Sequence, residues 1–313
     1  MYYLITLIRN FLFSCGFIKS QRYSDIFVLC VGNIRVGGTG KTPMIEYLIR
    51  NLQDEFPLSV VSLGYKRKTK GLKEVLVSDT ADAVGDEPKQ MKEKFPNILF
   101  FVNKNRNTAI DFIRKNYSNI RLILLDDAYQ YRKTSPNATI LLTEYNRPYF
   151  NDKIIPYGRL REQRIQSKRA NYIIVTKCPN DITQNEKQDF IKKLSPLPYQ
   201  KVFFSKIQYK FSTEITNNSK LLFVAGIDNP SPAVKYLQML GYDVILKKYP
   251  DHYNFKEKDI REIETLSKQD RIIITTEKDA VKLKQFDIKF VTLQIENSID
   301  GNLIQEIKNQ MLL

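Results

Sequence analysis

The segment from residue 26 to residue 52 constrains the fold more than any other part of the chain. It begins with an apolar run, Ile26 to Val31, continues through the stretch GNIRVGGTGKT (32–42) and ends in a helix-like run, Pro43 to Leu52. A strand, a tight glycine turn and a helix in this order are typical of a phosphate-binding loop, because backbone N–H groups and the positive end of the helix then face the phosphate oxygens. An ordinary tight connection between a strand and a helix is the alternative interpretation.

The end of this loop carries the predicted nucleotide contacts. In a phosphate loop Lys41 reaches the β- and γ-phosphates, and the Thr42 hydroxyl contacts Mg²⁺. The spacing departs from the usual G-x-x-x-x-G-K-[ST], because Arg35 stands where the first glycine belongs. Other glycines supply the flexibility instead. The predicted nucleotide-binding residues are Gly37, Gly38, Thr39, Gly40, Lys41 and Thr42.

The order of apolar and helical patterns predicts the architecture. Apolar, β-branched runs alternate with helical patterns over the first two-thirds of the chain, which indicates a parallel α/β sheet with ligands at the carboxyl ends of its strands. The stretch SPLP (195–198) interrupts this alternation, and a second α/β set follows. We therefore predict a phosphate-loop (P-loop) NTPase-like domain over 25–200 and a smaller α/β domain over 201–313 that contributes to the active-site cleft.

Residues 1–24 have the pattern of an amphipathic helix. Apolar side chains recur at helical spacing, opposite Thr6, Arg9 and Asn10: they are Leu4, Leu7, Ile8, Phe11, Leu12 and Cys15. The segment also carries Lys19 and Arg22 and no acidic residue. A basic amphipathic helix can lie in the headgroup region of an anionic bilayer, so we predict an interfacial helix. Packing against its own domain is the alternative, and no uncharged run reaches transmembrane length.

The charge balance favours anionic partners. The chain has 49 Lys and Arg against 34 Asp and Glu, a net charge of +15, which suits nucleic acid, an anionic membrane or a phosphorylated substrate. A generally basic composition explains part of this excess. No zinc-finger spacing or aromatic RNA-binding signature is present, so we predict no nucleic-acid partner. The three cysteines are far apart, which argues against a disulfide framework or a structural zinc site.

Two acidic side chains follow the apolar run 122–125. Asp126 and Asp127 therefore stand where nucleotide-transferring sheets hold Mg²⁺ opposite the phosphate loop. A solvated helix N-cap is the alternative interpretation for an acidic strand end.

Two further motifs place charged side chains at loops. In GDEP (85–88), Asp86 begins a helix, where a helix cap followed by proline is a sufficient explanation by itself. In GRLRE (158–162), Arg161 suits a phosphate and Glu162 suits a metal ion. A surface cluster of salt bridges is the alternative for this second motif.

Taken together, the motifs resemble the tetraacyldisaccharide 4′-kinases, the lipid A biosynthesis kinases that work at the inner face of the Gram-negative inner membrane. The resemblance runs in order from residue 32 to residue 283, and the phosphate loop of this family has the same irregular spacing. The matching stretches are GNIRVGGTGKTP, SLGYKRK, VGDEPKQM, NKNR, LLDDAYQ, EYNRPYFND, PYGRLRE, VTKCP, DHYNF and TTEKDAVKL.

The resemblance implies a reaction, a location and a set of roles. ATP and Mg²⁺ would be cosubstrates, and the 4′-hydroxyl of an acylated glucosamine disaccharide 1-phosphate would be phosphorylated to give lipid IVA. The enzyme would act at the cytoplasmic face of the bacterial inner membrane, and no obligate protein partner is predicted. Lys41 and Thr42 would hold the triphosphate and metal, Asp126, Asp127 and Glu162 would organise Mg²⁺, Asp86 would be the base oriented by His252, and Arg106, Gln130 and Arg161 would face phosphate or substrate.

Two positions depart from the family pattern. Tyr131 stands where the family usually has a histidine after Asp-Asp-x-x-Gln, and Leu63 replaces an arginine of Ser-Arg-Gly-Tyr. Tyr131 can donate a hydrogen bond but cannot take up a proton near neutrality. These departures concern substrate binding, whereas the catalytic positions are intact.

Three alternatives to this reaction remain open at the level of sequence. They are a different small-molecule kinase, a nucleotide-driven metallochaperone or membrane-surface regulator, and a nucleic-acid-dependent ATPase. A regulator needs no base such as Asp86 with His252, the single histidine of the chain. A metallochaperone would carry a Cys-rich motif, which is absent from the sequence.

Overall fold

The computed structural model describes residues 2–251, 253–268 and 270–312. Its strands are β1 (Gln21–Arg22), β2 (Phe27–Gly32), β3 (Leu58–Ser62), β4 (Lys73–Glu74), β5 (Leu99–Val102), β6 (Leu122–Asp126), β7 (Thr134–Ser135), β8 (Ala138–Glu144), β9 (Tyr172–Cys178), β10 (Lys201–Phe211), β11 (Lys220–Ala225), β12 (Asp243–Lys248), β13 (Arg271–Thr276) and β14 (Val291–Ile299). Its helices are α1 (Tyr2–Ser14), α2 (Lys41–Leu52), α3 (Ala81–Val84), α4 (Asp86–Lys94), α5 (Arg106–Asn116), α6 (Gln184–Leu194), α7 (Ser231–Met239), α8 (Glu257–Ser267), α9 (Glu277–Leu283) and α10 (Leu303–Met311), with short 3-10 helices η1 (Tyr149–Asn151) and η2 (Arg164–Arg169).

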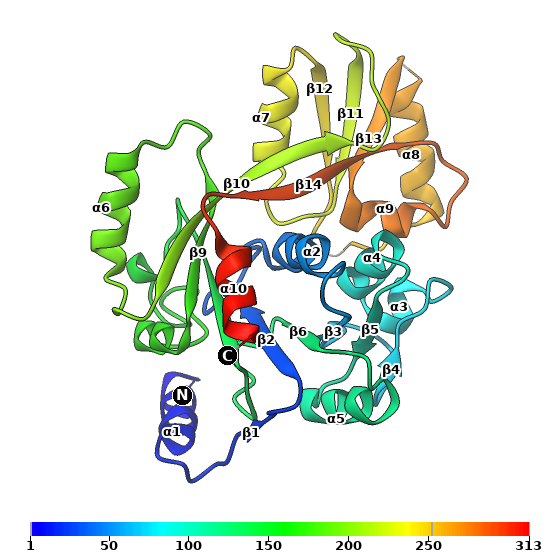
Figure 1. Cartoon of the computed structure of the whole chain (residues 1–313). Coiled ribbons are helices and arrows are strands. Elements are labelled where there is room, and N and C mark those ends of the chain that lie inside the picture. The colour runs from blue at the N-terminus through cyan, green and yellow to red at the C-terminus, as the bar shows by residue number, and fades with distance from the viewer. Residues whose placement is uncertain (1, 252, 269, 313) are drawn as a thin grey trace.

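One sheet runs through most of the molecule (Figure 1). Its strand order in the described chain is β12-β11-β13-β14-β10-β9-β8-β2-β6-β3-β5-β4. The strands from β9 to β5 pair in parallel, and β4 adds an antiparallel edge. The apolar runs read from the sequence are the parallel strands, because strands covered on both faces need continuous hydrophobic side chains.

Helices cover both faces of the N-terminal part of this sheet. Alternate strand residues such as Leu29 and Leu124 pack in one core with Ile45 and Leu48 of α2. The intervening residues form a second core with Ile110 and its neighbours on α5. The loop that precedes α2 follows β2 directly and therefore lies at the carboxyl end of this strand.

The C-terminal part is a smaller α/β unit joined to the first by strand pairing. β10 pairs in parallel with β9 and in antiparallel with β14, so these two long strands carry the sheet from one part to the other. Beyond them, β11 pairs in parallel with β12 and β13. Helix α9, which follows β13 in this unit, packs against α4 of the first unit.

The C-terminal helix α10 returns to the first unit. Leu303 and Ile307 are fully buried in the core that contains α2, and the Tyr172 hydroxyl donates a hydrogen bond to the Glu306 carbonyl at 3.2 Å. The sequence-based boundary had placed these residues in the smaller domain. Leu303 and Ile307 lie one helical turn apart and form an apolar face. The chain after β14 runs back to the first unit, so this face packs in the core there.

Helix α1 lies apart from both cores, on the outside of the first unit (Figure 1). Its polar residues face the protein, since Thr6 and Asn10 are only 6% and 4% exposed. Its apolar residues face outward, with Ile5 and Phe11 57% and 59% exposed. No helix in the described part of the chain is long and apolar enough to cross a membrane.

Candidate active site

The glycine-rich loop connects β2 directly to α2. Gly37 and Gly40 have φ angles of 115° and 88°, in the region that only glycine adopts without strain. The loop is held by side chains: Asn33 Nδ2 donates to Thr39 Oγ1 at 2.5 Å, and Thr176 Oγ1 of β9 donates to the Thr39 carbonyl at 3.0 Å. Helix α2 begins at Lys41, and no described side chain caps it. The N-terminus of α2 is therefore available for an anion.

Asp126 and Asp127 lie beside this loop because β6 is the neighbour of β2. The register pairs Val31 with Asp126, so both strands end at the same level. Asp126 is buried, and Ser62 Oγ of the next strand donates to its Oδ2 at 3.0 Å. Its Oδ1 has no hydrogen-bond partner among the described residues. Asp127 Oδ2 lies 3.7 Å from Lys41 Nζ.

The two carboxyl groups have opposite electrostatic surroundings. Burial, followed by the charges of Glu87 and Asp127, raises the pKa of Asp126 to about 7. Burial also acts to raise the pKa of Asp127, but Lys41 and Arg161 outweigh it and hold the pKa below its usual value. The positive charge of Lys41 acts on Asp126 but does not outweigh burial and the neighbouring carboxylates. An orphaned buried oxygen at such a place suits a bound cation.

Asp86 begins α4 and faces the second unit. Lys282 Nζ of α9 lies 2.7 Å from Asp86 Oδ2, and the Lys282 side chain is 5% exposed. The same ammonium group donates to the Tyr253 carbonyl at 3.1 Å. The sequence pattern does not single out Lys282, although this residue lies within the TTEKDAVKL stretch. Nor does it single out Glu87, the residue after Asp86, whose charge acts on Asp126. His252, the predicted partner of Asp86, lies outside the described residues.

Two of the three predicted substrate-facing residues contact the start of the phosphate loop. Gln130 Nε2 donates to the Asn33 carbonyl at 2.7 Å, and Arg161 Nη2 donates to the same oxygen at 3.1 Å. Arg106 is buried, with its guanidinium 5.2 Å from the centre of the Tyr131 ring. The structure thus brings Gln130 and Arg161 together at the phosphate loop and places Arg106 against the tyrosine that departs from the family pattern.

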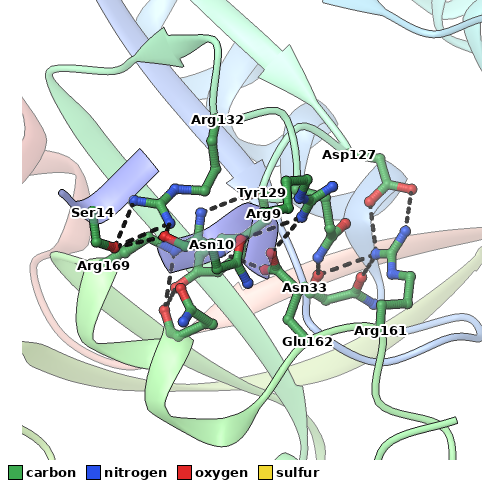
Figure 2. A network of polar contacts seen from close by, with 12 residues as sticks. Arg9, Asn10, Ser14, Asn33, Asp127, Tyr129, Arg132, Arg161, Glu162 and Arg169 are labelled. Carbon is green, nitrogen blue, oxygen red and sulfur yellow. Dashed lines mark hydrogen bonds and ion pairs between the residues drawn. The ribbon is translucent and has the colours of Figure 1, made fainter. Parts of the chain in front are cut away.

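Glu162 has different partners from those the sequence suggested. It is fully buried, and its two oxygens are paired with Arg9 Nη2 at 2.8 Å and Arg169 Nη2 at 2.5 Å (Figure 2). The role of Glu162 as a metal ligand stays a prediction, and in the described structure both of its oxygens are engaged by arginines. No group of three or more His, Cys, Asp or Glu side chains in the described part of the chain is arranged to hold a metal ion.

Comparison with known proteins establishes the family. The family described as tetraacyldisaccharide-1-P 4′-kinase matches residues 1–312. The chain belongs to this family. Tetraacyldisaccharide 4′-kinases of Flavobacterium psychrophilum and Flavobacterium johnsoniae are 41% and 38% identical to it, and each match covers 99% of this chain and 95% or 96% of the relative. The enzyme of Bacteroides thetaiotaomicron is 37% identical over 90% of this chain and 80% of its own.

A solved structure of the same family has the same fold. The crystal structure of an LpxK from Aquifex aeolicus in complex with ATP matches with a TM-score of 0.76 and 24% identity, over 99% of this chain and 95% of that one. The predicted α/β fold is confirmed. Membership of the 4′-kinase family also confirms the predicted enzyme class and reaction, ATP-dependent 4′-phosphorylation in lipid A biosynthesis. The non-catalytic alternatives are thereby excluded.

Proposed function

We propose that this kinase uses ATP with Mg²⁺ at the phosphate loop and acts at the cytoplasmic face of the inner membrane, converting an acylated disaccharide 1-phosphate to lipid IVA. The observation that carries the metal part is the buried Asp126 beside Lys41 and Asp127, with an oxygen that has no hydrogen-bond partner among the described residues. The ATP complex of the Aquifex relative supports the nucleotide assignment.

The residues that would hold Mg²⁺ are Thr42 and the two aspartates. Mg²⁺ usually binds through one or two carboxylates together with waters and substrate phosphates, so it does not need a cluster of three acidic, His or Cys ligands, which the described residues do not provide. When bound, the ion would neutralise charge on the β- and γ-phosphates. Lys41 and the N-terminus of α2 would bind the same phosphates, and Lys41 would also hold Asp127 in place.

The proton of the acceptor hydroxyl needs a base, and we assign that role to Asp86. A new bond forms between the 4′-oxygen and the γ-phosphorus, the bond to the bridging oxygen of ADP breaks, and Asp86 accepts the hydroxyl proton. Lys282 holds the Asp86 carboxylate from the second unit. Both units of the chain would thus contribute to one site.

The membrane assignment rests on the orientation of α1. Its polar face contacts the protein and its apolar face is exposed, which is the reverse of a helix that packs on a hydrophobic core. The net charge of +15 complements anionic lipids. The acyl chains of the substrate stay in a bilayer, so an enzyme that acts on its headgroup gains from binding the same surface.

One pair of assays tests this proposal. Incubation with a tetraacyldisaccharide 1-phosphate in detergent micelles should add the mass of one phosphoryl group, only with ATP and only without a Mg²⁺ chelator. Transfer to a different acceptor, or full activity in the chelator, would contradict it. In sedimentation with vesicles that contain phosphatidylglycerol, the double variant Ile8→Ser, Phe11→Ser should bind much less than wild type. Equal binding of the two proteins would contradict the role of α1.

A further inference from the structure

Two adjacent side chains connect α1 with the phosphate site. Arg161 and Glu162 follow one another in the loop before η2, and the Arg161 backbone N–H donates to the Ile34 carbonyl at 2.7 Å. Figure 2 shows that Arg161 points to Asp127, while Glu162 points to Arg9 of α1. This short backbone segment therefore contacts both the phosphate site, through Arg161, and α1, through Glu162.

The Arg161 side of this segment holds Asp127. Arg161 Nη2 lies 3.0 Å from Asp127 Oδ1, and Nη1 donates to Oδ2 at 3.3 Å. Such a two-point contact sets the direction of the carboxylate as well as its position. Since Asp127 also lies 3.7 Å from Lys41, a shift of Arg161 would disturb the lysine of the phosphate loop.

The Glu162 side of the segment depends on α1. Glu162 is fully buried, so its charge needs close cationic partners, and α1 supplies one of the two. Arg169, the other partner, is also engaged with Tyr129: its Nη1 donates to the Tyr129 carbonyl at 2.9 Å, and its guanidinium lies 4.4 Å from the centre of the ring. Without Arg9, the carboxylate would be drawn to one side.

The rest of the α1 contact is also polar. Arg132 Nη1 donates to the Asn10 carbonyl at 2.7 Å, and Gln163 Nε2 donates to the Tyr3 hydroxyl at 2.8 Å. Because the apolar face of α1 is exposed, hydrophobic burial contributes little to holding this helix on the protein. The ion pair between Arg9 and Glu162 is the contact that joins α1 to the residue next to Arg161 in this loop.

We propose that Arg9 is a positioning residue for phosphoryl transfer, acting through Glu162 on Arg161 and Asp127. The apolar face of α1 is left for the membrane, and its polar face becomes part of the support of the active site. The inference rests on the proposed role of Asp127 at the phosphates, but not on membrane binding.

The direct test is Arg9→Met, assayed in detergent micelles at saturating lipid and ATP so that membrane binding does not affect the measured rate. We expect kcat to fall by about 10- to 100-fold, the usual cost of removing an outer residue that orients a ligand side chain. The variant Arg9→Lys, which keeps the charge, should recover part of the rate. The matched control is Arg114→Met, which removes an arginine from the surface ion pair with Asp25. Wild-type kcat in Arg9→Met would overturn the proposal.

A double-variant cycle separates positioning from general loss of structure. If Arg9 acts through Arg161, the double variant Arg9→Met, Arg161→Met should be no slower than Arg161→Met alone. Losses that multiply would show that Arg9 acts elsewhere and would overturn the proposal. A rate lost on vesicles but retained in micelles would also overturn it, because Arg9 would then serve only membrane binding. Failure of wild-type protein to bind vesicles would contradict the membrane assignment alone, since the micelle assay does not require it.

Discussion

Asp126→Asn should make the ligand-free protein more stable while removing its activity. The buried carboxyl group has its pKa raised from 3.8 to about 7 by burial, Glu87 and Asp127. Its ionised form is therefore disfavoured in the folded state. Asparagine has nearly the same shape, and its amide oxygen can still accept the hydrogen bond from Ser62.

The magnitude follows from proton linkage. Because the folded pKa is raised, the stability associated with this group is fully present below the unfolded pKa and is lost as the pH rises from 3.8 through about 7. The rise of the pKa from 3.8 to about 7, at 1.36 kcal/mol for each pH unit, corresponds to about 4 kcal/mol of lost folding stability. This loss is complete near pH 8 and less than half complete near pH 5. The advantage of Asp126→Asn over wild type should therefore grow with pH.

Thermal unfolding of wild type and variant, followed by calorimetry without nucleotide or Mg²⁺, measures this difference. The matched control is Asp127→Asn, because Lys41 and Arg161 hold the pKa of Asp127 below its usual value despite its burial. Asp127→Asn removes a stabilising charge, so this control should lower Tm, in contrast to Asp126→Asn. The loss should be smaller near pH 8 than near pH 5, because the same change removes one cause of the raised pKa of Asp126. A Tm difference between wild type and Asp126→Asn that does not change with pH would refute the electrostatic reasoning.

The remaining predictions concern the reaction and the loop. Lys41→Ala should lower kcat by about 10²–10³-fold or more without loss of the fold, since its charge acts on the transferred phosphoryl group; near-wild-type turnover at saturating ATP would exclude this role. Asp86→Asn should slow the reaction by about 10²–10⁴-fold with little change in ATP affinity, and the double variant with His252→Ala should lose much less than the product of the single losses. Multiplying losses would mean that the two residues are independent. Gly32→Ala should lower Tm, because its Cβ would lie 2.7 Å from Tyr129 Cβ; an unchanged Tm would contradict the tight packing.

Local patterns in the sequence determined the fold class and the centre of the site. The apolar runs predicted the parallel strands because a strand buried on both faces requires them. The glycines, Lys41 and Thr42 indicated the phosphate loop because they lie within one short connection. Asp126 and Asp127 could be placed opposite that loop, since carboxyl ends of parallel strands share one edge of the sheet.

Tertiary structure decided which distant charges meet and what covers each apolar face. Arg9 and Glu162 are 153 positions apart, and Lys282 reaches Asp86 from a different unit, so no local pattern could pair them. Helical periodicity showed that α1 and α10 each have an apolar face, but not whether that face meets the core. In α10 it does, and in α1 the polar face docks instead. The physical reason is that periodicity shows which side chains share one face of a helix or strand. What that face packs against depends on the positions of all the other elements in the fold.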